Sequence, residues 1–228
     1  MFQALVDGMA ALLNWLYQFT QLIHLPNYGL AIVLLTVIVK MILYPLTVKQ
    51  MRSMVVMQQL APRVKEIQER YKSKDPQKMQ QKIMELYKEH NVNPMSGCLP
   101  LLIQLPILIA LYRALLHFNY ADPLHARFFW IGSLSQVGDP LFILPVLAGI
   151  TTYVQSRMTT NMTDPTQRIM LITMPLFIAW ISSTVPAGLA LYWVTFNVVG
   201  IVQQHFVNRH TRVLKEALSQ GGGSRENR

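Results

Sequence analysis

The chain has 228 residues, of which 52% are hydrophobic and only 14% are charged. A soluble domain carries about 25% charged residues, so this composition, with its long apolar runs, favours an integral membrane protein over a soluble one. The net charge of +9 could also suit nucleic acid, but no aromatic-interleaved basic face organises the Lys and Arg residues. We therefore expect the lipid bilayer as a partner, and no DNA.

Residue types that support catalysis or metal binding are not grouped in this sequence. The single cysteine, Cys98, excludes an intrachain disulfide and a four-cysteine metal site. The six histidines have no paired metal spacing, and no phosphate-binding loop, acid pair or nucleophile beside a base is found. We predict no cofactor, no metal and no catalytic residue, and thus a protein that is not an enzyme.

The first half of the chain predicts an amphipathic helix, an apolar span and a charged hairpin. Residues 1–26 repeat apolar side chains at helical spacing, which predicts an extracytoplasmic interfacial helix. Residues 27–48 are apolar enough for a first transmembrane helix. Residues 49–93 carry ten Lys or Arg and five acidic residues, and Asp75-Pro76 interrupts their helical period, which predicts a helical hairpin in the cytoplasm.

Four more apolar runs follow the hairpin and complete a predicted all-α fold with five transmembrane helices. These runs cover residues 97–118, 140–158, 169–186 and 188–207. The segments between and after them are predicted as an extracytoplasmic loop at 119–139, a cytoplasmic loop at 159–168 and a basic flexible cytoplasmic tail at 208–228.

The distribution of Lys and Arg predicts the orientation in the membrane. Most of the 20 Lys and Arg residues lie in 49–93, 159–168 and 208–228, whereas Arg127 is the only one in 119–139. Because basic loops stay in the cytoplasm, we expect a multi-pass protein with its amino terminus outside and its carboxyl terminus inside. Arg113, near the outer end of the second span, is expected to anchor the helix at the interface.

Lys40 is the strongest functional candidate. It lies near the middle of the predicted first span, where a lysine costs about 2.5 to 3.5 kcal/mol, and no acidic residue occurs in any predicted span. We predict that Lys40 faces a water-filled, positively charged cavity that receives an anionic guest. Alternatively, Gln and Thr side chains could hydrogen-bond its ammonium group, so that Lys40 only sets helix packing.

Polar side chains at helical spacing in the other spans predict the rest of this cavity. The candidate substrate-groove residues are Lys40, Thr36, Gln104, Thr152, Gln155, Tyr192, Trp193 and Asn197. The hairpin adds five methionines, whose flexible side chains suit contact with varied hydrophobic segments. These candidates for substrate capture are Met51, Met54, Met57, Met79 and Met84, although the same residues could form the seam between the two hairpin helices.

Four runs of this sequence resemble the YidC/Oxa/Alb family of membrane protein insertases. They are YGLAI (28–32), TVIVKMILYPLT (36–47), VNPMSGCLPLLIQLP (92–106) and PAGLALYW (186–193). The resemblance covers nearly the whole chain and is to the bacterial branch in its short form, which lacks a large extracytoplasmic domain. It therefore implies the bacterial cytoplasmic membrane as the location.

The resemblance implies a hydrophilic groove that receives nascent membrane proteins and releases their hydrophobic segments into the bilayer. By motif position, Lys40 would supply the positive charge, Thr36 and Trp193 would contact the guest, and Gln155 would line the groove. The ribosome and the Sec translocon are further candidate partners. The family usually has arginine where this chain has Lys40, and lysine keeps the charge without arginine's bidentate fork.

Two other functions are compatible with parts of the pattern. A small transporter or channel could use Lys40 as an anion site, although transporters commonly contain inverted repeats and we detect no internal repeat. An assembly factor could bind partners through its hairpin and use the bundle only as an anchor.

Overall fold

The structure, a computed structural model, describes residues 2–71, 75–90, 99–116, 118, 120–159 and 165–222, and there the predicted all-α fold is confirmed. In this part of the chain, β-structure is limited to isolated β-bridges. The helices in chain order are α1 (Phe2–Leu22), α2 (Tyr28–Ile42), α3 (Tyr44–Tyr71), α4 (Pro76–Glu89), α5 (Leu99–Leu116), the 3-10 helix η2 (Pro123–Ala126), α6 (Ile143–Thr159), α7 (Pro165–Ser182) and α8 (Ala187–Gly222).

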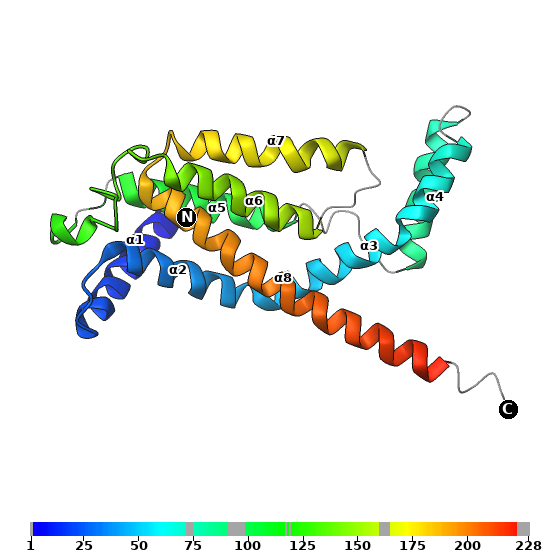
Figure 1. The fold of residues 1–228 in the computed structure, drawn as a ribbon, viewed down its shortest axis with the longest axis horizontal. Helices are drawn as coiled ribbons and strands as arrows, with labels where there is room; N and C mark the ends of the chain where they lie inside the picture. The colour runs from blue at the N-terminus through cyan, green and yellow to red at the C-terminus, as the bar shows by residue number, and fades with distance from the viewer. Residues whose placement is uncertain are drawn as a thin grey trace.

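The helices form a bundle from which the α3–α4 hairpin projects. Helix α8 packs against α2 and α6, α7 packs mainly against α6, and α1 covers α2 and α5. The α3–α4 hairpin stands out at one end, and α1 and η2 lie at the opposite end (Figure 1). The apolar core joins α1, α2, α5 and the start of α8, with Leu13, Ile32, Leu111 and Tyr192 nearly or fully buried.

A sharp bend divides the segment predicted as the first span. Helix α2 begins at the N-cap Asn27, whose side chain accepts a hydrogen bond from the Leu30 amide, and it ends at Ile42. Pro45 lacks the N–H that would continue the helical ladder, and α3 starts at Tyr44 at an angle of 61° to α2. Lys40 consequently lies in the last turn of α2 rather than in the middle of a longer helix.

A helix that crosses a bilayer must be long and apolar enough to span its hydrocarbon core. Among the described residues, no helix meets the requirement alone, whereas α2 and the first part of α3, up to Met57, meet it together across their bend. Shorter apolar stretches lie at Leu102–Leu116 and Arg168–Ser182.

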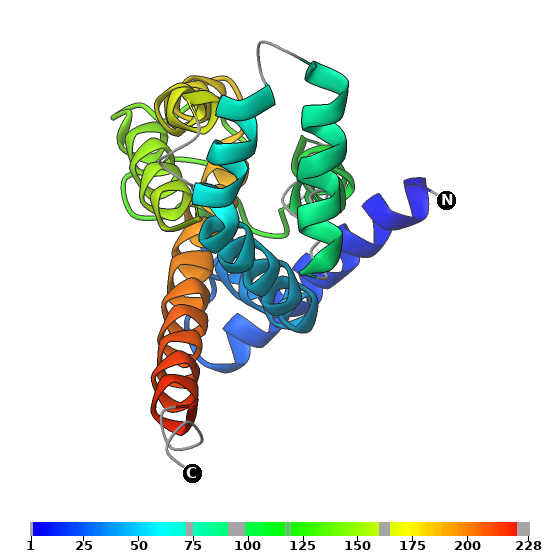
Figure 2. The same ribbon diagram turned by 90° about the vertical axis from the view of Figure 1, so that its right-hand side faces the viewer.

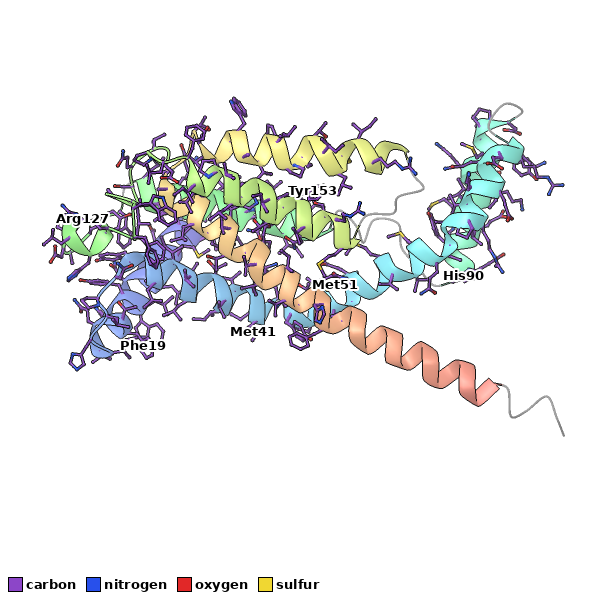
Figure 3. The ribbon with its side chains drawn as sticks, in the orientation of Figure 1. Phe19, Met41, Met51, His90, Arg127 and Tyr153 are labelled. Carbon is purple, nitrogen blue, oxygen red and sulfur yellow. The ribbon has the colours of Figure 1, made fainter. Side chains whose placement is uncertain are left out.

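The hairpin consists of α3 and α4, which lie side by side (Figure 2). Helix α4 starts with Pro76 after the N-cap Asp75, whose side chain accepts a hydrogen bond from the Lys78 amide. Of the five candidate methionines, Met51 is buried where α3 leaves the bundle (Figure 3), three are half-buried and Met84 is exposed. Leu60 and Leu86 are also buried, so leucine contributes to burial in the hairpin alongside methionine.

The carboxyl-terminal segment differs from the flexible tail expected at 208–228. Helix α8 runs without interruption from Ala187 to Gly222, and only 223–228 lie outside the described residues. The segment 212–218 contains Arg, Leu, Lys, Glu and Ala, which all have high helix propensity. Helix formation therefore continues beyond the apolar part of α8.

The end of the bundle opposite the hairpin is closed by the segment 120–142, here called the cap loop. The Tyr17 and Tyr28 rings stack at 3.8 Å, and the Tyr17 hydroxyl lies 2.7 Å from Nδ1 of His125 in the loop. Nδ2 of the Asn27 side chain donates a hydrogen bond of 2.7 Å to the Arg127 carbonyl. These contacts fix the loop to α1 and to the start of α2.

Gly29 provides the space in which Phe128 of the cap loop packs. A Cβ at residue 29 would overlap the Phe128 ring, whereas a Cβ at Gly8 would meet nothing within 4 Å. We expect Gly29→Ala to lower the free energy of unfolding by about 1 to 3 kcal/mol through overpacking. The control Gly8→Ala should raise it by roughly 0.5 to 1 kcal/mol through helix propensity. Unfolding in mixed detergent micelles, followed by circular dichroism, measures both, and equal effects would contradict the packing argument.

Candidate functional site

Lys40 lies between α2, α6 and α8, and its side chain is only 4% exposed. Its Nζ sits 3.3 Å from the centroid of the Phe196 ring on α8, which is a close cation–π contact. Its backbone carbonyl accepts a hydrogen bond of 3.3 Å from Nε2 of Gln203. The following residue, Met41, points to the exposed side of α2 (Figure 3). The ammonium group is therefore covered by α8.

The missing side chain of Gly200 allows this close approach. A Cβ at Gly200 would lie 3.1 Å from Nζ of Lys40 and 2.5 Å from Nε2 of Gln155 on α6. Lys40 and Gln155, two of the candidate groove residues, thus meet at the bare backbone of α8. We call the Phe196 ring, Gly200 and the Gln155 side chain the cation seat.

No carboxylate neutralises Lys40 among the described residues. Their ion pairs join Lys65 to Glu69, Lys82 to Glu85 and His125 to Asp122, all outside the cation seat. Burial of an unpaired charge costs several kcal/mol, whereas a desolvated cation–π contact returns about 2 kcal/mol. The Phe196 ring therefore offsets only part of the cost, and an added anion would still be favourable.

A second polar contact joins α6 to α8. Nδ2 of Asn197 donates hydrogen bonds to Oγ1 of Thr151 at 3.1 Å and to Oγ1 of Thr152 at 2.8 Å. Asn197 is buried, whereas both threonines are half-buried. The candidate groove residues Thr152 and Asn197 therefore form a pair, and Asn197 directly follows Phe196 in α8.

Of the remaining candidate groove residues, some are buried in the bundle and others are half-buried. Nε2 of Gln104 on α5 donates a hydrogen bond of 2.8 Å to the buried Tyr192 hydroxyl, and Trp193 is half-buried. Thr36 is fully buried, and its hydroxyl donates to the Ile32 carbonyl at 2.7 Å. Thr36 consequently packs inside the bundle and is not displayed to a guest. Arg113 is exposed, with its Cζ 5.3 Å from the Phe2 ring, away from the cation seat.

The structure departs from the predicted water-filled surroundings of Lys40. The ammonium group is covered by an aromatic ring instead of facing an open cavity. Sequence reasoning missed Phe196, Gly200 and Gln203. Their spacing of four and three residues places them on one face of α8, and this spacing is the signal that could have identified them.

The arrangement defines a helical protein in which a cation is buried between apolar helices, with no carboxylate partner in the described part of the chain. Residues 18–215 match the model of the family described as "60Kd inner membrane protein". The chain is 48% identical to the membrane protein insertase YidC of Wolinella succinogenes over 91% of this chain, 44% identical to that of Helicobacter pylori strain J99 over 93%, and 46% identical to that of Campylobacter jejuni over 91%. It spans 38% of the length of each of these relatives.

A solved structure of an active YidC insertase, with its first transmembrane domain resolved, is similar to this fold with a TM-score of 0.71 and 31% sequence identity. The match covers 89% of this chain and 46% of the other. The chain therefore belongs to the 60Kd inner membrane protein family, which includes the YidC insertases.

Proposed function

We propose that this protein inserts other membrane proteins into the lipid bilayer and that it does so by binding, without catalysing a reaction. The observation that carries the proposal is Lys40, a buried cation without a carboxylate partner among the described residues, in a chain of the YidC family. Nascent membrane proteins are the proposed substrates. A polar or acidic segment of the guest would supply the missing anion.

The proposed mechanism needs no nucleotide. A polar segment is costly in hydrocarbon because its groups lose their water, and the side chains of Lys40, Gln155 and Asn197 would lower that cost. The hydrophobic segment of the guest gains free energy by leaving water for lipid. Binding of the polar segment and partitioning of the apolar segment would together drive insertion.

The proposed topology follows the positive-inside distribution of Lys and Arg. The bent α2–α3 pair, α5, α6, α7 and α8 would form the five spans, with α1 along the outer surface. The hairpin and the carboxyl-terminal part of α8 would lie in the cytoplasm. Of the hairpin methionines, Met84 has the exposure that capture of a hydrophobic segment requires.

A photo-crosslinking amino acid tests the proposed contact with the guest. At Trp193, which is half-buried on α8, it should crosslink to a single-spanning protein during that protein's synthesis. The matched control is Trp15, an exposed tryptophan on α1, which should crosslink far less. Equal crosslinking at both positions would contradict a defined guest site beside α8.

Reconstitution separates insertion from transport. Vesicles that contain only this protein should insert a single-spanning substrate and show no ion flux. Anion flux without insertion would instead favour the transporter or channel.

A further inference from the structure

The Phe196 ring covers the charge that the proposed function would present to a guest. Nζ of Lys40 lies 3.3 Å from the ring centroid, and Gly200 lets the ammonium approach the α8 backbone. A charge in this position is not available to a partner that approaches from water, since the side chain is almost completely buried. Use of the charge therefore requires it to leave the cation seat.

We infer that Phe196 is a positioning residue that holds Lys40 in a covered resting position until an acidic group of a guest draws the ammonium off the ring. This inference rests on the proposed function and adds a selectivity step to it. The group of the guest that Lys40 recognises is then a carboxylate. A carboxylate forms charge-assisted hydrogen bonds with an ammonium group, whereas an aromatic ring attracts it only through its quadrupole.

The strength of the ring contact sets the size of the effect. A desolvated cation–π contact corresponds to about a 30-fold preference for the covered state. A guest that binds only the uncovered state therefore has an apparent affinity about 30-fold lower than its intrinsic affinity for that state. Acidic guests would pass this step, while neutral polar guests would gain nothing from uncovering Lys40.

Chemical labelling of Lys40 tests the inference without any guest. The full chain in lipid nanodiscs is treated with a water-soluble N-hydroxysuccinimide ester, and acylation of each lysine is followed by mass spectrometry. Phe196→Leu removes the ring and should raise the acylation rate of Lys40 by about 5- to 30-fold. Phe196→Tyr keeps the ring and should leave the rate near that of the unsubstituted protein.

Two controls separate loss of the ring from general loosening. Exposed Lys49 should be acylated at the same rate in every variant, and Phe206→Leu, at an exposed phenylalanine of the same helix, should leave Lys40 unchanged. Equal Lys40 rates in Phe196→Leu and the unsubstituted protein would overturn the inference. Equal acceleration by Phe196→Leu and Phe196→Tyr would also overturn it, because packing alone would then protect Lys40.

Insertion measurements add a readout that damaged packing would not produce. For a single-spanning protein with an acidic amino-terminal segment, Phe196→Leu should lower the half-saturating concentration several-fold. An analogue with Asn and Gln in place of the acidic residues should show no change. If Phe196→Leu weakens insertion of both proteins, the inference is wrong.

The inference and the proposed function can fail separately. If Lys40→Gln inserts the acidic substrate normally, the proposed role of the charge fails even if labelling shows that Phe196 protects Lys40. If Lys40→Gln loses insertion while Phe196→Leu changes neither labelling nor half-saturation, only the inference fails.

Discussion

Replacing Lys40 with glutamate is expected to abolish insertion of single-spanning substrates that have acidic amino-terminal segments. The substitution puts a carboxylate beside the carboxylates of the guest, and two like charges about 4 Å apart repel by about 4 kcal/mol in a partly polar protein site. That repulsion corresponds to a loss of roughly a thousandfold in binding. Insertion into vesicles, measured by protease protection of the substrate, gives the result directly.

Two control substitutions, Lys40→Arg and Lys49→Glu, test whether the effect comes from the charge at residue 40. Lys40→Arg keeps the charge and should support insertion, with a ring contact still possible for the guanidinium group. Lys49→Glu makes the same charge reversal at an exposed position of α3 and should retain most activity. Full activity of Lys40→Glu would rule out a role for the positive charge in guest binding.

Replacing Asp139 with alanine is expected to destabilise the protein by about 3 kcal/mol or more. Its carboxylate, almost completely buried, accepts hydrogen bonds from the Trp130 indole at 3.0 and 3.1 Å and from the amides of Leu141 at 3.2 Å and Leu144 at 2.7 Å. Alanine would remove the charged acceptor of three donors, and each hydrogen bond to a charged group contributes about 1.5 to 3 kcal/mol. The free energy of unfolding in mixed detergent micelles measures the loss.

Asp122 provides the comparison for this prediction. Its more exposed carboxylate accepts a hydrogen bond from the Leu124 amide and lies 3.8 Å from Nε2 of His125. Because water can replace these partners, Asp122→Ala should cost about 1 kcal/mol or less. If both alanine variants unfold alike, the buried network around Asp139 does not hold the cap loop to α6.

Several properties of the fold were predictable because they depend on local pattern. Apolar runs and their helical period predicted helices close to the observed α1, α5, α6 and α7, and Asp75-Pro76 predicted the start of α4. The first span was predicted over residues 27–48 without a bend, whereas α2 ends at Ile42 and α3 begins at Tyr44. The break falls just before Pro45, where the missing N–H of the proline and the restriction on Tyr44 act.

The candidate site was predictable in part. Lys40 and Gln155 were predicted to share a site, and the structure brings both to Gly200. Thr36 was a candidate for the same reason, as a polar residue in an apolar segment, but its hydroxyl donates a hydrogen bond to the carbonyl of Ile32, as threonine in a helix often does. Phe196 was missed because a phenylalanine in an apolar helix gives no sign of a cation partner until the helices are packed.

The sequence by itself determined the helical class, the placement of a lysine in an apolar segment without an acidic companion, and the family of the protein. These properties follow from composition, period and motif, which are local or additive along the chain. Only the tertiary structure decided what Lys40 contacts. Its partners come from α6 and α8, more than a hundred residues away in the chain, and the contact depends on how closely Gly200 lets two helices approach.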